Sequence, residues 1–132
     1  MKAVLVVEDD LHMRAFIRVL LETAGYGAII TQNGREGLQR AGESLPDLII
    51  LDLMMPEEGG IPMYRELKSS DRLKHIPVIV LSGVENNTFS HSLRMLNLGQ
   101  ADPIPGPEAY IEKPPNPEEL LQTIQHILGP GV

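Results

Sequence analysis

The feature that most constrains the fold is an alternation of short apolar runs with segments of helical periodicity. Three runs, 3–7, 47–51 and 77–81, are nearly continuous in aliphatic residues. Continuous apolar runs of this length are typical of strands covered on both faces, as in a parallel sheet. With two further runs at 27–30 and 109–112, the sequence predicts a five-stranded α/β sheet.

The segments between these runs carry single apolar stripes. Apolar residues over 16–24 repeat at i, i+1, i+4, i+5 and i+8, and residues 120–128 repeat in a similar way. Such stripes indicate helices lying against a sheet. The last helix has a start signal, in which Asn116 can cap, Pro117 fits the first turn and Glu119 can reach back to the cap. We therefore predict five helices, one after each strand, in a doubly wound fold.

Composition limits the function of the chain. The 132 residues, 42% of them hydrophobic, predict one domain over 1–132. No apolar run approaches the roughly 18 residues of a membrane span, so we expect a cytoplasmic protein without membrane contact. The absence of cysteine excludes disulfides and thiol chemistry, and a formal charge of −7 argues against direct nucleic-acid binding.

Polar side chains follow four of the five predicted strands. Acids occupy 8–10 after the first strand, Asp52 follows the third, Ser82 the fourth and Lys113 the fifth. In doubly wound sheets, ligands bind beyond the carboxyl ends of the strands. We therefore expect these residues to share one site, with the loop through Pro56 leaving the space above Asp52 open.

This residue set fits phosphoryl transfer. Two carboxylates about 4 Å apart repel by about 4 kcal/mol at an effective dielectric near 20. Mg²⁺ removes that repulsion and accepts phosphate oxygens, and an aspartate beside it can act as a nucleophile. Lys113 and the Ser82 hydroxyl would supply charge and a donor for the phosphoryl oxygens.

Four motifs in order, "VLVVEDD", "DLIILDLMMP", "PVIVLSG" and "YIEKP", resemble the receiver domain of two-component response regulators. The resemblance covers nearly the whole chain. It implies a flavodoxin-like sheet in strand order 2-1-3-4-5 and a phosphorylation-dependent switch in a two-component system or phosphorelay. It also implies a sensor histidine kinase or histidine phosphotransfer protein as phosphodonor, a downstream protein target, and no enzymatic activity beyond the domain's own phosphoryl transfer and dephosphorylation.

The resemblance also assigns roles to individual residues. Asp52 would be the phospho-acceptor, Ser82 the switch hydroxyl, Tyr110 the switch aromatic, and Lys113 the partner of the phosphoryl group, aimed by a cis bond to Pro114. Mg²⁺, which Mn²⁺ can replace, would be held by Glu8, Asp9, Asp52 and the backbone carbonyl of Met54.

Simpler interpretations exist for some of these residues. Asp10 is assigned mainly to capping the first helix, and Ser82 and Tyr110 could serve capping and packing. The histidines lack ligand spacing and are interpreted as surface residues. Two other functions are weighed: a phosphohydrolase of the haloacid-dehalogenase type, which would need an aspartate where Met54 stands, and a receiver-like adaptor that never takes phosphate.

Two departures from the family pattern stand out. Gly59-Gly60 replaces the usual Asp-Gly, and the interval from Ser82 to Lys113 is several residues longer than usual. The extra length contains a proline-rich insertion, 102–108, which predicts a semi-rigid exposed loop. It is either a tolerated surface insertion or an edge that one partner reads; in the second case we expect a monomer, because the loop would obstruct a symmetric dimer.

Overall fold

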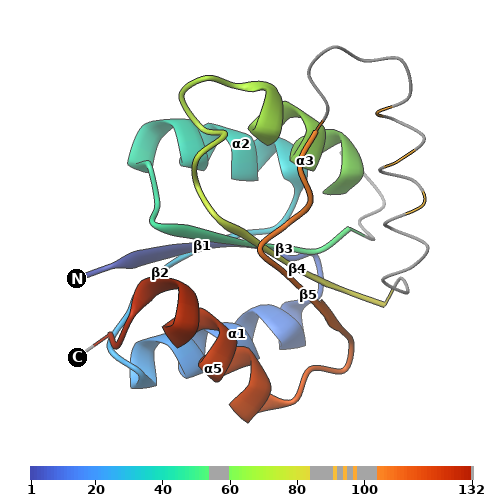
Figure 1. Cartoon of the computed structure of the whole chain (residues 1–132). Coiled ribbons are helices and arrows are strands. Elements are labelled where there is room, and N and C mark those ends of the chain that lie inside the picture. Colours follow the sequence, from blue (N-terminus) through green and yellow to red (C-terminus); the bar gives the residue numbers. More distant parts are fainter. Residues whose placement is uncertain (54–59, 84–90, 92–93, 95–96, 98–103, 132) are drawn as a thin grey trace.

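Five parallel strands form a single sheet in the order β2-β1-β3-β4-β5, as predicted (Figure 1). β3 and β4 are buried along their whole length, and β1 is buried from Val4 to Val7, which confirms that both faces of the sheet are covered. The strands span β1 (Ala3–Val7), β2 (Gly27–Thr31), β3 (Leu48–Leu51), β4 (Val78–Ser82) and β5 (Ala109–Glu112).

The computed structural model describes residues 1–53, 60–83, 91, 94, 97 and 104–131. Four helices lie within these ranges: α1 (Leu11–Thr23), α2 (Gly34–Ser44), α3 (Gly60–Ser69) and α5 (Pro117–Leu128). The fifth predicted helix, between β4 and β5, falls largely outside the described residues. Within the same ranges, no helix has the length and apolar character needed to cross a bilayer.

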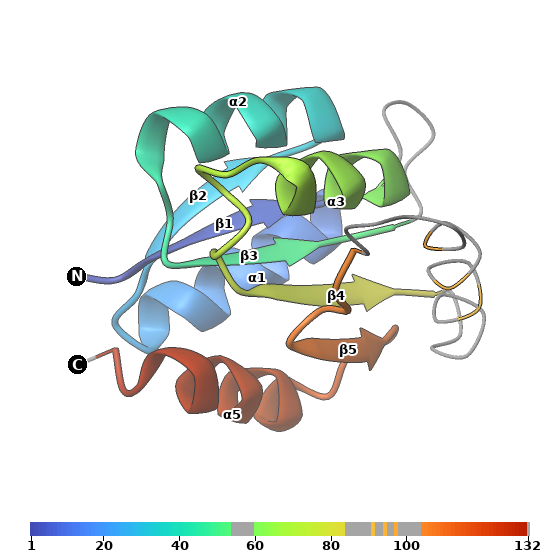
Figure 2. The same cartoon turned by 45° about the horizontal axis from the view of Figure 1, so that its top comes forward.

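The helices cover the sheet in two layers. α2 and α3 lie on one face, and α1 and α5 lie on the other (Figure 2). Alternate strand residues divide between two cores accordingly: Leu5, Val7 and Leu51 pack toward α2 and α3, whereas Val6 and Ile50 pack toward α1 and α5. From the helices, the buried residues of the predicted apolar stripes, Ile17, Leu21, Leu120, Ile124 and Leu128, complete the second core.

Side-chain caps fix where the helices begin. Asn116 accepts a 3.0 Å hydrogen bond from the Glu119 N–H, which confirms the predicted start of α5. Asp10 caps α1 in the same way, accepting from the Met13 N–H at 2.7 Å. Both caps satisfy backbone donors that the first helical turn leaves without an intrahelical partner.

The described part of the proline-rich segment corrects one expectation. Pro105 and Gly106 are exposed as predicted, but Ile104 is 6% exposed and belongs to the core beside α3. The Tyr64 hydroxyl donates to the Pro105 carbonyl, and Lys68 Nζ lies 3.7 Å from Glu108 Oε1. The end of the segment is therefore anchored to α3, because its one large apolar side chain finds a place in the core.

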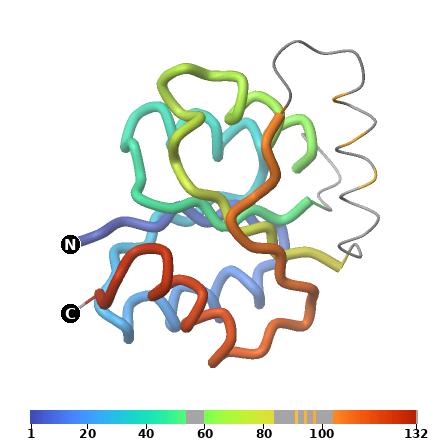
Figure 3. Tube along the Cα trace, in the orientation of Figure 1, coloured from blue at the N-terminus to red at the C-terminus, as the bar shows by residue number. Residues whose placement is uncertain are grey.

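The two chain ends lie at the same end of the sheet, where the parallel strands begin (Figure 3). The Lys2 ammonium donates to the Leu128 carbonyl, and the Tyr26 hydroxyl donates to the Gly129 carbonyl. These bonds attach the end of α5 to the start of the chain and to the connection between α1 and β2. The opposite edge of the sheet, where the strands end, carries the acids and Lys113.

Candidate functional site

The strand ladder positions the polar residues at the carboxyl edge of the sheet. The backbone N–H of Glu8 donates to β2 at Thr31 (3.1 Å), and that of Asp52 donates to β1 at Val7 (3.0 Å). The N–H of Lys113 donates to Ser82 on β4 at 2.9 Å. Each residue therefore directly follows a strand and is held by its neighbour, which brings the predicted strand-end residues together.

Three carboxylates meet at this edge. Glu8, Asp9 and Asp52 each offer one oxygen, and these oxygens all lie within 4.8 Å of one another. Glu8 and Asp52 are 1% and 2% exposed, whereas Asp9 is exposed to solvent. Hard carboxylate oxygens at this spacing, with one side open to water, fit Mg²⁺, which takes few protein carboxylates and keeps several waters. Met54, the predicted carbonyl ligand, lies outside the described residues.

Lys113 links the two buried carboxylates. Its Nζ lies 2.6 Å from Glu8 Oε1 and 3.1 Å from Asp52 Oδ2. The Lys113-Pro114 bond is cis, as predicted. The two buried carboxylates need a positive partner such as the Lys113 ammonium, because an unpaired charge away from water is costly.

Burial and charge shift the pKa values of this cluster. Burial raises the pKa of Glu8 to about 7, with the charge of Asp52 adding to the rise, against hydrogen bonds from Lys113 and the Asp10 N–H. For Lys113, burial alone would lower the pKa, but its contacts with Glu8 and Asp52 outweigh burial and raise it. Lys113 therefore stays charged at neutral pH, and Glu8 is the acid of this cluster whose proton is exchanged near neutrality.

Ser82 and Tyr110 lie on the neighbouring strands β4 and β5. Ser82 is fully buried at the last position of β4, and Tyr110 is half-buried on β5. Burial raises the pKa of Tyr110, as do the charges of Glu112 and Asp52, and a hydrogen bond with Ser82 opposes the rise. The predicted switch hydroxyl and switch aromatic are therefore linked to each other and lie near the acid site.

The structure also tests the simpler interpretations of Asp10 and of the four histidines. Asp10 caps α1, which confirms that interpretation. The four histidines are all exposed, as predicted, at positions His12, His75, His91 and His126.

Two residues near the site were missed by sequence reasoning. A Cβ on Gly60 would lie 2.3 Å from the Asp52 carbonyl oxygen, so only glycine allows α3 to begin this close to the backbone that follows β3. Arg14 donates from Nη1 to the carbonyls of Glu8 (3.0 Å) and Asp9 (2.8 Å). Gly60 was noted only as the second residue of Gly59-Gly60, where the family often has Asp-Gly, without a structural role, and nothing in the sequence marked Arg14.

The doubly wound sheet therefore carries an acid cluster, a lysine and a hydroxyl together at its carboxyl edge. A sequence model of the response regulator receiver domain matches residues 4–125. The chain belongs to this family. It is 39% identical over 129 residues to the polar-differentiation response regulator DivK of Brucella anthropi, covering 97% of both chains.

Solved structures agree with this assignment. The chemotaxis protein CheY4 of Vibrio cholerae superposes with a TM-score of 0.82 at 28% identity, over 96% of this chain and 98% of that one. The receiver domain of sensor histidine kinase PA1611 from Pseudomonas aeruginosa, solved with a magnesium ion in its active site cleft, gives 0.81 at 22% identity over 97% and 98%. The second likeness supports the fold alone.

Proposed function

We propose that residues 1–132 act as a single receiver domain that takes a phosphoryl group on Asp52 and signals through altered partner binding. Receiver domains are signalling switches, and the family assignment favours this role over a phosphohydrolase. The phosphodonor is a phosphohistidine on a sensor histidine kinase or a histidine phosphotransfer protein. The output is contact with a downstream protein.

The observation that carries the proposal is the position of Lys113. The Lys113 ammonium contacts both Glu8 and Asp52. When a phosphoryl group is attached to Asp52, the same ammonium can pair with the negative charge of that group. Asp52 is 2% exposed and directly follows β3, which places its carboxylate at the carboxyl edge of the sheet. A loose phosphoryl transfer needs positioning and charge more than covalent chemistry from the protein.

Different residues of the chain have different roles in the phosphoryl transfer. An Asp52 oxygen forms the bond to phosphorus as the P–N bond of the donor histidine breaks, and the histidine nitrogen keeps the electron pair and takes a proton. The Lys113 ammonium and the Ser82 hydroxyl bind phosphoryl oxygens. Glu8, Asp9 and Asp52 would hold Mg²⁺ or Mn²⁺, with the Met54 carbonyl as the further ligand that the family resemblance implies. The cation would supply positive charge for the phosphoryl oxygens.

Tyr110 and Ser82 would carry the signal outward. Ser82 is buried at the end of β4 and is hydrogen-bonded to Tyr110 on β5. A phosphoryl group on Asp52 that takes the Ser82 hydroxyl would compete with Tyr110 for it. The resulting change at β5 would reach the surface on which a downstream partner binds.

Intact-mass measurement tests the assignment of Asp52. Treatment of the wild type with acetyl phosphate and Mg²⁺ should add one phosphoryl mass, and chelator should prevent the addition. Asp52→Asn should take none, because an amide is no nucleophile here. Asp71→Asn is the matched control, since that side chain is 99% exposed and remote from the site in sequence.

Persistence of the added mass in Asp52→Asn would contradict the assignment. Steady turnover of phosphomonoesters by the wild type would instead favour the phosphohydrolase. A wild type that binds Mg²⁺ but takes no phosphoryl group from acetyl phosphate or from a phosphohistidine protein would favour the adaptor.

A further inference from the structure

Two of the three acids of the site, Glu8 and Asp9, are consecutive residues, whose side chains an extended strand would not bring together. Side chains of neighbouring strand residues point to opposite faces of the sheet. Glu8 and Asp9 nevertheless offer oxygens to the same cluster, within 4.8 Å of each other and of Asp52. The backbone must therefore turn directly after β1, and the convergence of the acids depends on what holds that turn.

The Arg14 side chain is hydrogen-bonded directly to the backbone of this turn. Its Nη1 donates to two successive carbonyls, those of Glu8 at 3.0 Å and Asp9 at 2.8 Å. The Glu8 N–H is bonded to β2 at Thr31, so the turn is fixed on its strand side by the sheet and on its outer side by Arg14. The Asp10 N–H donates to Glu8 Oε2 at 3.0 Å, which ties the carboxylate itself to the turned backbone.

The helix makes this contact rigid. Arg14 lies in the first turn or so of α1, whose start is fixed by the Asp10 cap. The Arg14 N–H also donates to the Asp10 carbonyl at 2.9 Å, and the side chain is half-buried. A guanidinium on a fixed helix loses little further freedom when it binds two carbonyls in one place.

We propose that Arg14 is a positioning residue for the acid cluster: by holding the Glu8 and Asp9 carbonyls, it turns both carboxylates toward the cation they bind. This role rests on the magnesium site of the proposed function. Arg14 contacts backbone and none of the carboxylate oxygens through these bonds, so it is no catalytic residue.

The direction in which Mg²⁺ affinity changes when Arg14 is removed distinguishes a positioning role from a purely electrostatic effect. A guanidinium near a cation site repels the cation, so removing it should tighten Mg²⁺ binding if Arg14 acted only through its field. If Arg14 positions the acids, its removal should weaken Mg²⁺ binding. Residues that orient metal ligands from outside the coordination shell typically change affinity by roughly tenfold or more.

The experiment compares Arg14→Met with Arg18→Met, which removes the same charge from an exposed position one turn further along α1. Titration calorimetry with MgCl₂ should show roughly tenfold weaker binding for R14M. R18M should bind as the wild type or slightly tighter. Arg14→Lys, which keeps the charge and an N–H donor group but not the guanidinium, should restore part of the loss.

A second measurement is made without metal. In chelator, amide hydrogen exchange followed by NMR should show faster exchange of the Asp10 N–H in R14M, because its acceptor, Glu8 Oε2, is no longer held. Exchange at this amide should be unchanged in R18M. If R14M does not fold, as judged by thermal melting, R14K and Arg14→Gln carry the same comparison.

Mg²⁺ binding by R14M that equals or exceeds that of the wild type would overturn the positioning role. Unchanged exchange at Asp10 would overturn it as well. Absence of Mg²⁺ binding in the wild type would instead overturn the magnesium site of the proposed function, so the two failures are distinguishable.

Discussion

Lys113 contacts two buried carboxylates, and a third acid, Asp9, lies close to them in solvent. One ammonium cannot neutralise three carboxylates, so the cluster keeps an excess of negative charge whenever its acids are ionised. That excess opposes folding when no cation is bound. At this scale, the requirements of cation binding and of stability conflict.

Asp9→Asn should therefore raise stability in chelator while weakening Mg²⁺ binding. It removes one of three mutually repelling carboxylates at an exposed position, which we expect to stabilise the metal-free protein by about 1 kcal/mol, or about 3 °C in melting temperature. Differential scanning calorimetry in chelator measures the first effect, and calorimetric titration with MgCl₂ the second. A variant that melts below the wild type without metal would contradict the repulsion.

The raised pKa of Glu8 predicts an unusual dependence of stability on pH in the absence of metal. Burial lifts this pKa from 4.5 to about 7, so between those values the folded state binds a proton that the unfolded state has released. The Glu8 contribution to stability is fully present below about pH 4.5 and is lost as pH rises through about 7.

Urea denaturation in chelator at several pH values measures this contribution. Glu8→Gln should flatten the decline between about pH 5 and 7.5, because the amide does not titrate. Addition of Mg²⁺ to the wild type should reverse the decline, since the cation binds the ionised form. A wild type whose free energy of unfolding rises with pH across this window, without metal, would be inconsistent with the raised pKa.

The sequence allowed site residues to be predicted where a reactive side chain stands at or directly after the end of a predicted strand. Glu8, Asp52, Ser82 and Lys113 each end or directly follow an apolar run, and parallel strands deliver such residues to one edge. Gly60 depends instead on how closely α3 approaches the Asp52 backbone, which no local pattern encodes.

At the scale of elements, the strands and the caps were predictable because each is determined locally. The apolar runs became strands to within about a residue at either end, and Asn116 caps α5 as its spacing indicated. The proline-rich segment was predicted less well. In its described part, 104–108, there is no helix or strand, as the prolines indicated. Ile104, however, packs in the core beside α3, a tertiary contact that overrides the polar, turn-rich surroundings.

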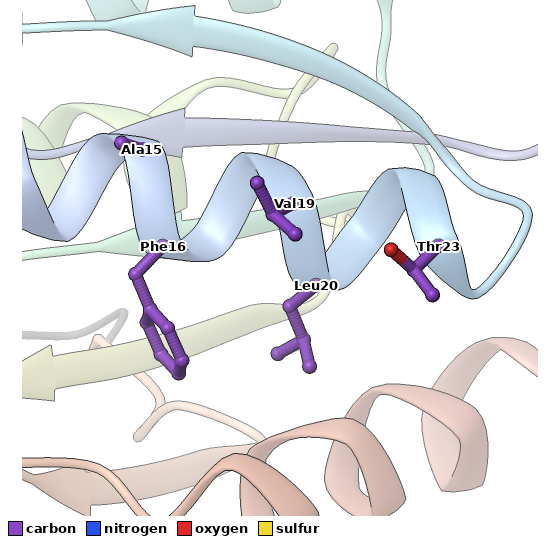
Figure 4. A pocket seen from close by; sticks show the side chains of 5 residues that line it. All are labelled: Ala15, Phe16, Val19, Leu20 and Thr23. Atoms are coloured by element: carbon purple, nitrogen blue, oxygen red, sulfur yellow. The ribbon is translucent and has the colours of Figure 1, made fainter.

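α1, the helix that begins directly after the acids at 8–10, carries an apolar surface. Ala15, Phe16, Val19, Leu20 and Thr23 line a shallow groove, here termed the α1 patch. Phe16 and Leu20 reach from the helix toward α5 (Figure 4), whereas Val19 is 62% exposed. Because α1 begins directly after the acid turn, we expect a protein that delivers a phosphohistidine to Asp52 to contact this patch as well.

Val19→Lys should therefore slow phosphoryl transfer from a phosphohistidine protein while leaving labelling by acetyl phosphate unchanged. A charge at the centre of an apolar contact typically costs 1–2 kcal/mol or more, so we expect a loss of roughly tenfold or greater in transfer rate. Leu45→Lys is the control, because Leu45 is 48% exposed and lies at the end of α2 away from the acids. Equal loss in both variants, or loss with acetyl phosphate, would contradict docking on the α1 patch.

The charge of the chain, and of β5 and α5 in particular, affects whether two copies can form a dimer. The chain carries a formal charge of −7, and neither β5 nor α5 contains a lysine or arginine. These two elements expose Glu112, Glu118 and Glu119. A symmetric dimer places the same surface of each copy against the other, so these acids would face one another. Association through β5 and α5 would therefore start against like-charge repulsion.

We accordingly predict a monomer, before and after phosphorylation. Light scattering coupled to size exclusion should give 14.6 kDa in moderate salt, with and without acetyl phosphate and Mg²⁺. Because repulsion between exposed charges is screened over about 8 Å at physiological salt, any weak association should strengthen as salt is raised. A doubled mass that appears on phosphorylation at low salt would contradict this prediction, since phosphorylation would then build a dimer despite the facing acids.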